Sequence, residues 1–179
     1  MSVKSATALG LSSGLEPGMV LLNTTSFSGV VSQRLNPFSA TYDNYRVIIQ
    51  LTSGGGSGDL EMRLASGASV LSGSNYSFAY MVRQIGPNAI TSGSNTSSTV
   101  WLIGGISNTS TTGDLNIVDI GNPFKTGYTT YTVTSTRLDD YVWTAGGKVN
   151  LTNSYDGFQI AAGSSHNMAG TISVYGYNK

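Results

Sequence analysis

Apolar and polar side chains alternate in short segments along most of the chain, and this alternation is the first guide to its structure. The clearest segment spans residues 44–52, in which Tyr, Val, Ile and Leu occupy positions 45, 47, 49 and 51, while Arg46 and Gln50 fall between them. Successive side chains of an extended strand point to opposite faces. The segment is therefore predicted to be a strand with one buried face and one solvated face.

Residues Leu60–Leu64 repeat this pattern, since their apolar positions alternate with Glu61 and Arg63. The glycine-rich stretch Ser53–Gly58 joins them to the first strand, and we expect the two strands to pair antiparallel across this connection. Other segments alternate in the same way or are rich in β-branched and aromatic residues. They are Met19–Thr25, Gly29–Leu35, Tyr76–Ile85, Thr99–Ile103, Asp114–Ile120, Tyr128–Ser135, Asp140–Thr144, Asp156–Ala161 and Gly170–Tyr177.

Helices are expected to contribute little. No window of eleven or more residues carries an apolar stripe of 3.6-residue period. Roughly eight to eleven short strands, with turns every ~8–12 residues, predict an all-β, antiparallel two-sheet sandwich that is jelly-roll-like. An immunoglobulin-like sandwich is the alternative. It is disfavoured because the chain has no cysteine pair and exceeds the ~100 residues of such domains.

Residues 1–18 lack this alternation and are rich in Ser, Gly and Ala, with Pro17 and Gly18 forming a turn at the end. We interpret them as an extended N-terminal arm that precedes a single sandwich domain, residues 19–179. Such an arm is either disordered or ordered against a neighbouring subunit, and disorder is expected for the isolated chain. Within it, Leu9 and Leu11 are the candidate contact residues.

Composition narrows the classes of partner. Charged residues make up only 10% of the chain, against ~25% in typical soluble domains, so Ser, Thr, Asn and Gly must cover much of the surface. Nine basic residues balance nine acidic ones without a basic cluster, which argues against nucleic acid. A membrane is equally disfavoured, because no apolar run approaches ~18 residues. The absence of cysteine excludes disulfides and thiolate metal sites.

The search for reactive groups finds no catalytic set. His166 is the only histidine and lies in a turn-like stretch without a nucleophile motif nearby. Asp139 and Asp140 are sequence neighbours, and Asp114 and Asp119 have an odd spacing, so each pair is expected to point to opposite faces of a strand. Calcium-loop spacing is also absent. We therefore predict a protein that is not an enzyme, with no cofactor and no metal.

Aromatic residues are the remaining candidates for recognition. Trp101 and Trp143 each lie inside a strand-like segment and are expected to pack in the core. Tyr175 and Tyr177 alternate with apolar residues of the last strand. If that apolar set points inward, both tyrosines point outward or into a contact between subunits.

Three stretches of the chain are similar to small jelly-roll virion proteins of tailed bacteriophages. These are Phe38–Leu51, which contains a Tyr-Asp-x-Tyr motif, Leu60–Leu64, and Met168–Lys179, which contains Gly-x-Ile-x-Val-Tyr-Gly. The resemblance covers about residues 18–179. It implies a surface component of the virion, commonly a homotrimer, and its motifs are structural, so they assign no functional residue.

Two roles are compatible with this resemblance. The first is a capsid decoration protein of the cement or head-protrusion type, attached through its arm and subunit contacts to itself and to the major capsid protein. The alternative is the receptor-binding head of a tail fibre, with a host-surface glycan as partner. A fibre head normally follows a shaft, whereas here only a short arm precedes the body, which favours decoration. Either role places the protein in the virion, assembled in the host cytoplasm and released by lysis.

Overall fold

A computed structural model describes residues 18–86, 88–107, 113–138 and 140–177. Within these ranges the chain forms thirteen strands and no helix, and accordingly the described residues contain no helix long and apolar enough to cross a membrane. The strands are β1 (Met19–Val30), β2 (Ser32–Leu35), β3 (Asn44–Gly54), β4 (Gly58–Ser66), β5 (Ser69–Val70), β6 (Tyr76–Gln84), β7 (Ile90–Ser98), β8 (Trp101–Ile106), β9 (Asp114–Gly121), β10 (Thr130–Arg137), β11 (Tyr141–Val149), β12 (Gly157–Ala162) and β13 (Met168–Tyr177).

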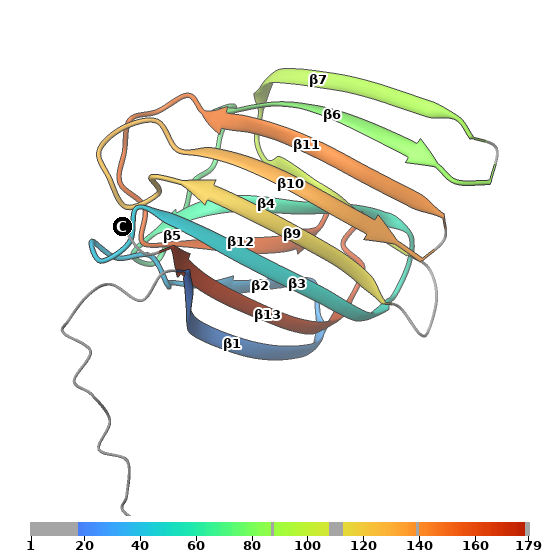
Figure 1. Ribbon diagram of the computed structural model, residues 1–179, viewed down its shortest axis with the longest axis horizontal. Coiled ribbons are helices and arrows are strands. Elements are labelled where there is room, and N and C mark those ends of the chain that lie inside the picture. Colours follow the sequence, from blue (N-terminus) through green and yellow to red (C-terminus); the bar gives the residue numbers. More distant parts are fainter. Residues whose placement is uncertain (1–17, 87, 108–112, 139, 178–179) are drawn as a thin grey trace, which may run out of the picture.

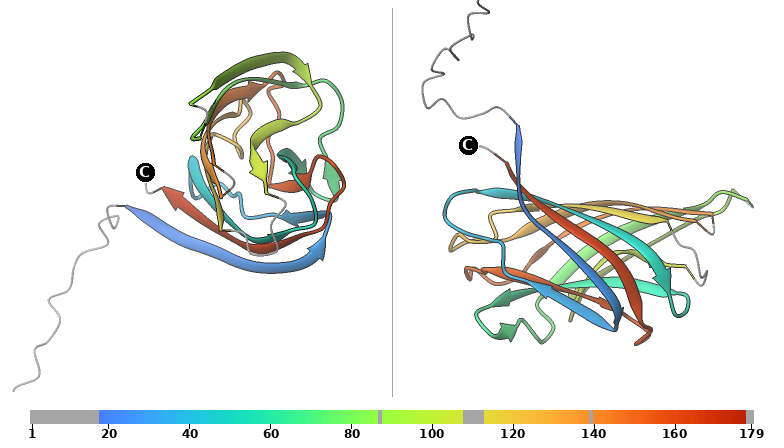
Figure 2. Two further views of the ribbon diagram at one scale, coloured as in Figure 1. Left: turned by 90° about the vertical axis from the view of Figure 1, so that its right-hand side faces the viewer. Right: turned by 90° about the horizontal axis from the view of Figure 1, so that it is seen from below.

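The strands form two antiparallel sheets that face each other, as Figure 1 shows. The larger sheet has eight strands in the order β1-β13-β3-β9-β10-β11-β6-β7. In the smaller sheet the order is β2-β12-β4-β5, and β8 also pairs with β4. The larger sheet curves around the smaller one (Figure 2). The predicted all-β, antiparallel two-sheet sandwich is therefore confirmed, while the predicted arm falls almost entirely on residues outside the described ranges.

The alternation of side chains explains how the sheets enclose their core. In β13 every second residue is buried and the residues between are half-buried, and β3 follows the same rule over most of its length. Buried side chains from both sheets form one cluster, and Trp101 is the bulkiest fully buried side chain among them. The Trp101 ring stacks on Tyr131 with 4.4 Å between ring centroids and meets Tyr76 edge-on at 5.5 Å. Trp101 and Trp143 are both buried, as predicted.

One predicted pairing is wrong. Strands β3 and β4 do not form a hairpin, because β3 lies between β13 and β9 in the larger sheet, whereas β4 pairs with β12, β5 and β8 in the smaller one. Their connection crosses from one sheet to the other. Within this connection the ring of His166 lies against Gly56, where a Cβ would come within 2.5 Å of the ring and require it to move. The alternation predicts which face of each strand is buried, but it does not predict which strand lies beside it. The buried faces of β3 and β4 contribute to the same core although the two strands belong to different sheets.

Both edges of the larger sheet differ from expectation. Strand β7 has nine residues, nearly all exposed, and within the described ranges it pairs only with β6. The sequence does not predict this strand, because a strand that is solvated on both faces shows no alternation. Strand β1 extends over twelve residues, beyond the predicted Met19–Thr25. The predicted strand Gly29–Leu35 is divided at Val31 between β1 and β2.

A buried polar cluster lies on the inner face of the larger sheet. The Asp114 carboxylate is fully buried and accepts hydrogen bonds from the backbone N–H groups of Ser107 and Leu138, both at 2.9 Å, and from the Ser107 hydroxyl. Asp119, on the same strand, is half-buried and lies on the outer face. The prediction that these two carboxylates face opposite sides is confirmed.

Candidate functional site

The first and last strands lie side by side and create the most distinctive outer surface of the molecule. Met19 pairs with Tyr177 and Leu21 with Tyr175 across the β1–β13 ladder. Met19 is 43% and Leu21 53% exposed, and both tyrosines are half-buried. We call these four residues the terminal surface. Tyr175 and Tyr177 thus lie on the outer face, whereas Leu9 and Leu11 are outside the described residues.

Strand β1 forms an open edge of the larger sheet. In the described part of the chain only β13 pairs with it. Its twelve residues include no charged residue and no proline, although natural edge strands commonly carry such residues as protection against pairing with other chains. Val20, which alternates with the terminal surface, is also 37% exposed. An uncharged edge with apolar side chains is typical of a strand that is covered by a protein partner.

An ion pair on the outer face holds Tyr177 in place. Arg46 of β3 donates from Nε and Nη2 to the two carboxylate oxygens of Asp119 on β9, at 2.8 and 2.7 Å. The Tyr177 hydroxyl donates to the same carboxylate at 2.5 Å, and the guanidinium carbon lies 5.7 Å from the centre of the Tyr177 ring. The bidentate pair also neutralises the charge of both partners at this surface.

These contacts shift the pKa of each acid in the group. The hydrogen bonds from Arg46 hold the pKa of Asp119 below its ordinary value, and the bond from Tyr177 acts in the same direction. Burial raises the pKa of Tyr177 to about 12, and the bond to Asp119 contributes to the rise. At neutral pH Asp119 is therefore ionised and Tyr177 keeps its proton.

A groove of about 410 Å³ adjoins the terminal surface. Its walls carry the hydroxyl, amide and carboxylate groups of Tyr177, Thr130, Thr132, Asn44 and Asp119. Gly121 also lines it, and a Cβ at this position would lie 2.9 Å from the Thr130 hydroxyl. A side chain at this position would therefore crowd the Thr130 hydroxyl on the wall of the groove. The groove can accept a side chain or a small polar group of a partner.

The other candidates from the sequence lie apart from this surface. His166 is half-buried in the loop between β12 and β13, against Gly56. Among the described residues, no group of three or more His, Cys, Asp or Glu side chains could hold a metal ion. The absence of enzymatic activity and of a cofactor stays a prediction.

The lowered pKa of Asp119 predicts how the stability of the fold changes in acid. Because the folded-state pKa is lowered, the contacts of the carboxylate stabilise the fold above the ordinary pKa of ~3.9 and are lost as the pH falls toward the folded-state value. The free energy of unfolding, measured with urea, should therefore fall more steeply between about pH 5 and pH 2 in the wild type than in Asp119→Asn. Tyr177→Phe, which keeps the Arg46 pair, should have an intermediate slope. Equal slopes in all three proteins would contradict the assigned role of the ion pair.

Sequence reasoning found two of the four residues of the terminal surface. Tyr175 and Tyr177 stood out by alternation, whereas Met19 and Leu21 belong to an uncharged run, Met-Val-Leu-Leu, that was interpreted only as a strand. The lack of any charge in that run was the available signal. A scan of protein-family models and a search of curated proteins give no match to this chain.

Proposed function

We propose that this protein is a non-enzymatic structural protein of a bacteriophage virion, most simply a capsid decoration protein. It attaches through its N-terminal arm and through the terminal surface. The observation that carries this proposal is the uncharged apolar edge of β1, with Met19 and Leu21 beside Tyr175 and Tyr177. Residues 1–18 lead directly into that edge, so the arm and the surface can engage one partner together.

The energetics favour such a contact. Burial of apolar surface contributes about 25 cal/mol per Å², from which the costs of association are subtracted. The two tyrosines have half-buried rings, and Tyr177 is held by the Arg46–Asp119 pair. Ordering them on a partner therefore costs little conformational entropy. The open backbone of β1 can also accept a strand from the partner.

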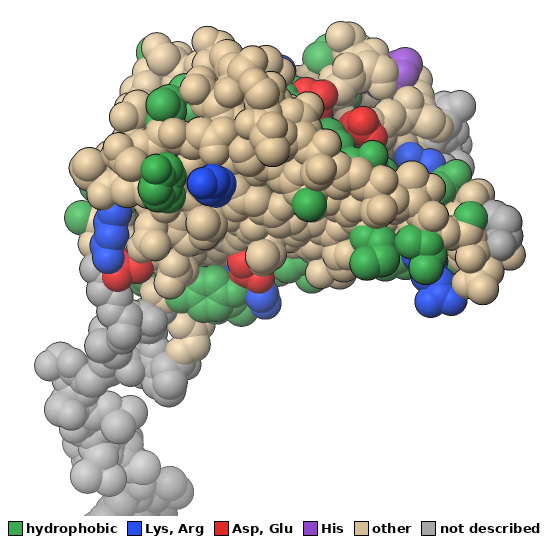
Figure 3. All heavy atoms as spheres, turned by 90° about the horizontal axis from the view of Figure 1, so that it is seen from above, with side chains coloured by type: hydrophobic (Ala, Val, Ile, Leu, Met, Phe, Trp, Pro, Cys, Tyr) green, Lys and Arg blue, Asp and Glu red, His purple; other side chains and the backbone are tan. Residues whose placement is uncertain are grey.

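The rest of the surface also supports a role in binding other proteins. Figure 3 shows one side of the molecule, on which charged side chains are few and scattered among uncharged atoms. With nine acidic and nine basic residues the net charge is zero, so long-range attraction would contribute little to association. Contact area and shape would then determine which partner is bound.

A charge placed in the terminal surface tests this proposal. The affinity of full-length Leu21→Glu is measured by co-sedimentation with capsids of the parent phage that lack this protein. It should be about 100-fold lower than the affinity of the wild type, because an unpaired buried charge costs roughly 3 kcal/mol. Thr24→Glu is the matched control. It adds the same charge to the same strand, at an exposed position outside the terminal surface, and should bind normally.

Two results would overturn capsid decoration. One is normal attachment of folded Leu21→Glu. The other is a wild-type protein that ignores capsids but adsorbs to host cells and blocks infection. That second result would support the alternative, a receptor-binding head that recognises a host glycan, which the hydroxyl-rich, uncharged surface also favours.

A further inference from the structure

The groove beside the terminal surface has the lining of a binding site in its own right. It lies on the outer face of the larger sheet, and β3, β9, β10 and β13 each contribute to it. The side chains of Ile120 and Tyr131 point into the core, so the backbone of these two paired residues forms the floor. Polar side chains surround the floor at Gly121, and we call this space the Gly121 groove.

Two polar atoms converge on the space above Gly121. A Cβ at this position would lie 2.9 Å from Thr130 Oγ1 and 3.5 Å from Asn44 Oδ1, and these residues come from the strands on either side of β9. Both residues are exposed and line the groove, so their polar atoms are accessible to a ligand. A hydroxyl both donates and accepts, so one ligand hydroxyl in this space can bond to both side chains.

Asp119 adds an acceptor that is already fixed in position. Its carboxylate accepts hydrogen bonds from Nε and Nη2 of Arg46 and from the Tyr177 hydroxyl. An ionised carboxylate has about four acceptor positions, and these three bonds leave roughly one of them, on Oδ2. Because 36% of the side chain is exposed, a ligand hydroxyl can donate to Oδ2 without displacing Arg46 or Tyr177.

The charges of the groove favour a neutral ligand. Arg46 balances the charge of Asp119, and none of the described residues that line the groove is a lysine or an arginine. An anion would therefore meet a carboxylate without a cation in the lining. A cation would gain little, because the carboxylate already has a partner of opposite charge.

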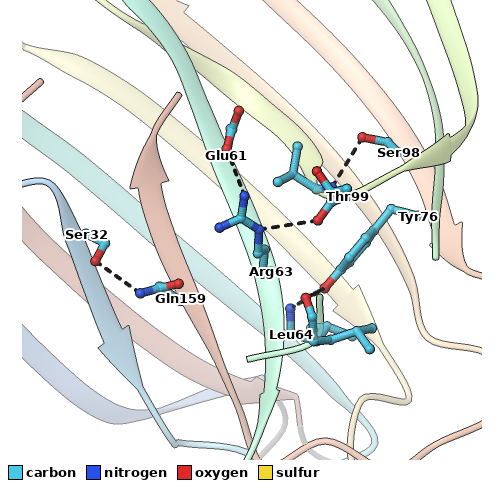
Figure 4. A network of polar contacts seen from close by, with 10 residues as sticks. Ser32, Glu61, Arg63, Leu64, Tyr76, Ser98, Thr99 and Gln159 are labelled. Carbon is cyan, nitrogen blue, oxygen red and sulfur yellow. Dashed lines mark hydrogen bonds and ion pairs between the residues drawn. The ribbon is translucent and has the colours of Figure 1, made fainter. Parts of the chain in front are cut away.

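A polar cluster on the smaller sheet shows how this lining differs from ordinary polar surface. In Figure 4, Arg63 lies between Glu61 and the Thr99 carbonyl and contacts both. Those groups are paired with one another. In the Gly121 groove, by contrast, the side-chain oxygens of Asn44 and Thr130 face a common space above a glycine.

We propose that the Gly121 groove binds a neutral saccharide, whose hydroxyls bond to Asn44, Thr130 and Asp119. A sugar presents hydroxyls around its rim and C–H groups on its faces, and the Tyr177 ring at the side of the groove offers apolar surface to those C–H groups. The volume of about 410 Å³ lies within the range of small-molecule sites, ≈ 300–1,000 Å³. The site does not depend on capsid attachment, because Tyr177 is the one lining residue that also belongs to the terminal surface.

Binding is measured by titrating the full chain with maltose, cellobiose, lactose and diacetylchitobiose, followed by nuclear magnetic resonance, and with anionic digalacturonate for comparison. The wild type should bind at least one of the four neutral disaccharides more tightly than digalacturonate. Thr130→Ala removes one of the converging hydroxyls and should weaken that binding about tenfold, which is the effect of one lost hydrogen bond. Its melting temperature should stay close to that of the wild type, because Thr130 is exposed.

Two further variants complete the test. Thr134→Ala is the matched control, because Thr134 lies on the same strand and the same face as Thr130, is also exposed, and does not line the groove. It should bind the disaccharide as the wild type does. Gly121→Val fills the space above the floor with a side chain that suits a strand. It should abolish binding while the circular dichroism spectrum stays that of a β-sheet protein.

The saccharide site is refuted by any of three results. They are no binding of the four neutral disaccharides, tighter binding of digalacturonate than of all four, and equal affinities for Thr130→Ala and Thr134→Ala. Leu21→Glu separates this site from capsid attachment, because Leu21 does not line the groove. That variant should lose capsid binding and keep the binding of the disaccharide, so a failure of one proposal is distinguishable from a failure of the other.

Discussion

Replacing Asp114 by alanine is expected to lower the free energy of unfolding by about 3–5 kcal/mol. The carboxylate is fully buried and accepts the backbone N–H groups of Ser107 and Leu138. Without it, the backbone N–H groups of Ser107 and Leu138 lose the carboxylate that accepts from both, and each lost hydrogen bond of this kind costs roughly 1–3 kcal/mol. Because a typical domain has only ~5–15 kcal/mol of stability, Asp114→Ala should come close to unfolding the protein. Urea unfolding followed by circular dichroism measures the loss.

The same strand supplies the control. Asp119 lies five positions further along β9 on the outer face, where 36% of its side chain is exposed. Exposed ion pairs contribute ~0–1 kcal/mol, so Asp119→Ala should cost about 1 kcal/mol or less. Equal losses for the two alanine variants would show that burial of Asp114 is not the source of its effect.

The second large effect is expected at Trp101, the bulkiest fully buried side chain of the core. Trp101→Ala should cost about 3–5 kcal/mol, because it removes a fully buried ring and leaves a cavity between Tyr131 and Tyr76. The substitution also ends the hydrogen bond from the indole N–H to the Lys148 carbonyl, at 3.3 Å. The loss is measured from urea unfolding followed by far-ultraviolet circular dichroism.

Trp101→Phe separates the two contributions. It keeps an aromatic ring against Tyr131 but removes the indole N–H and part of the volume, so a loss of about 1–2 kcal/mol is expected. A loss below about 1.5 kcal/mol for Trp101→Ala would mean that the core collapses around the missing ring, and the packing role assigned to Trp101 would then be wrong.

The sequence predicted local features of the fold better than long-range ones. Alternation in residues 44–52 and 170–177 identified the buried face of β3 and β13, because burial in a strand repeats every two residues. It could not identify β7, which is solvated on both faces. Nor could it place β3 and β4 in different sheets, because strand partners depend on segments far away in the chain.

The same limit applies to the candidate site. The outward direction of Tyr177 followed from its position in the last strand. The partners of Tyr177 could not be predicted in this way, because Arg46 and Asp119 belong to other strands. They come close to Tyr177 because β13 pairs with β3, and β3 with β9, in a particular register.

The pairing of β1 with β13 has a practical consequence for display on a particle surface. Because the first and last strands are antiparallel neighbours, the chain enters and leaves the body at the same end (Figure 1). The connection between β6 and β7 lies at the other end. A peptide epitope inserted directly before β1 or directly after β13 would therefore crowd the edge that is proposed to anchor the molecule, whereas one inserted between β6 and β7 would project away from the anchor.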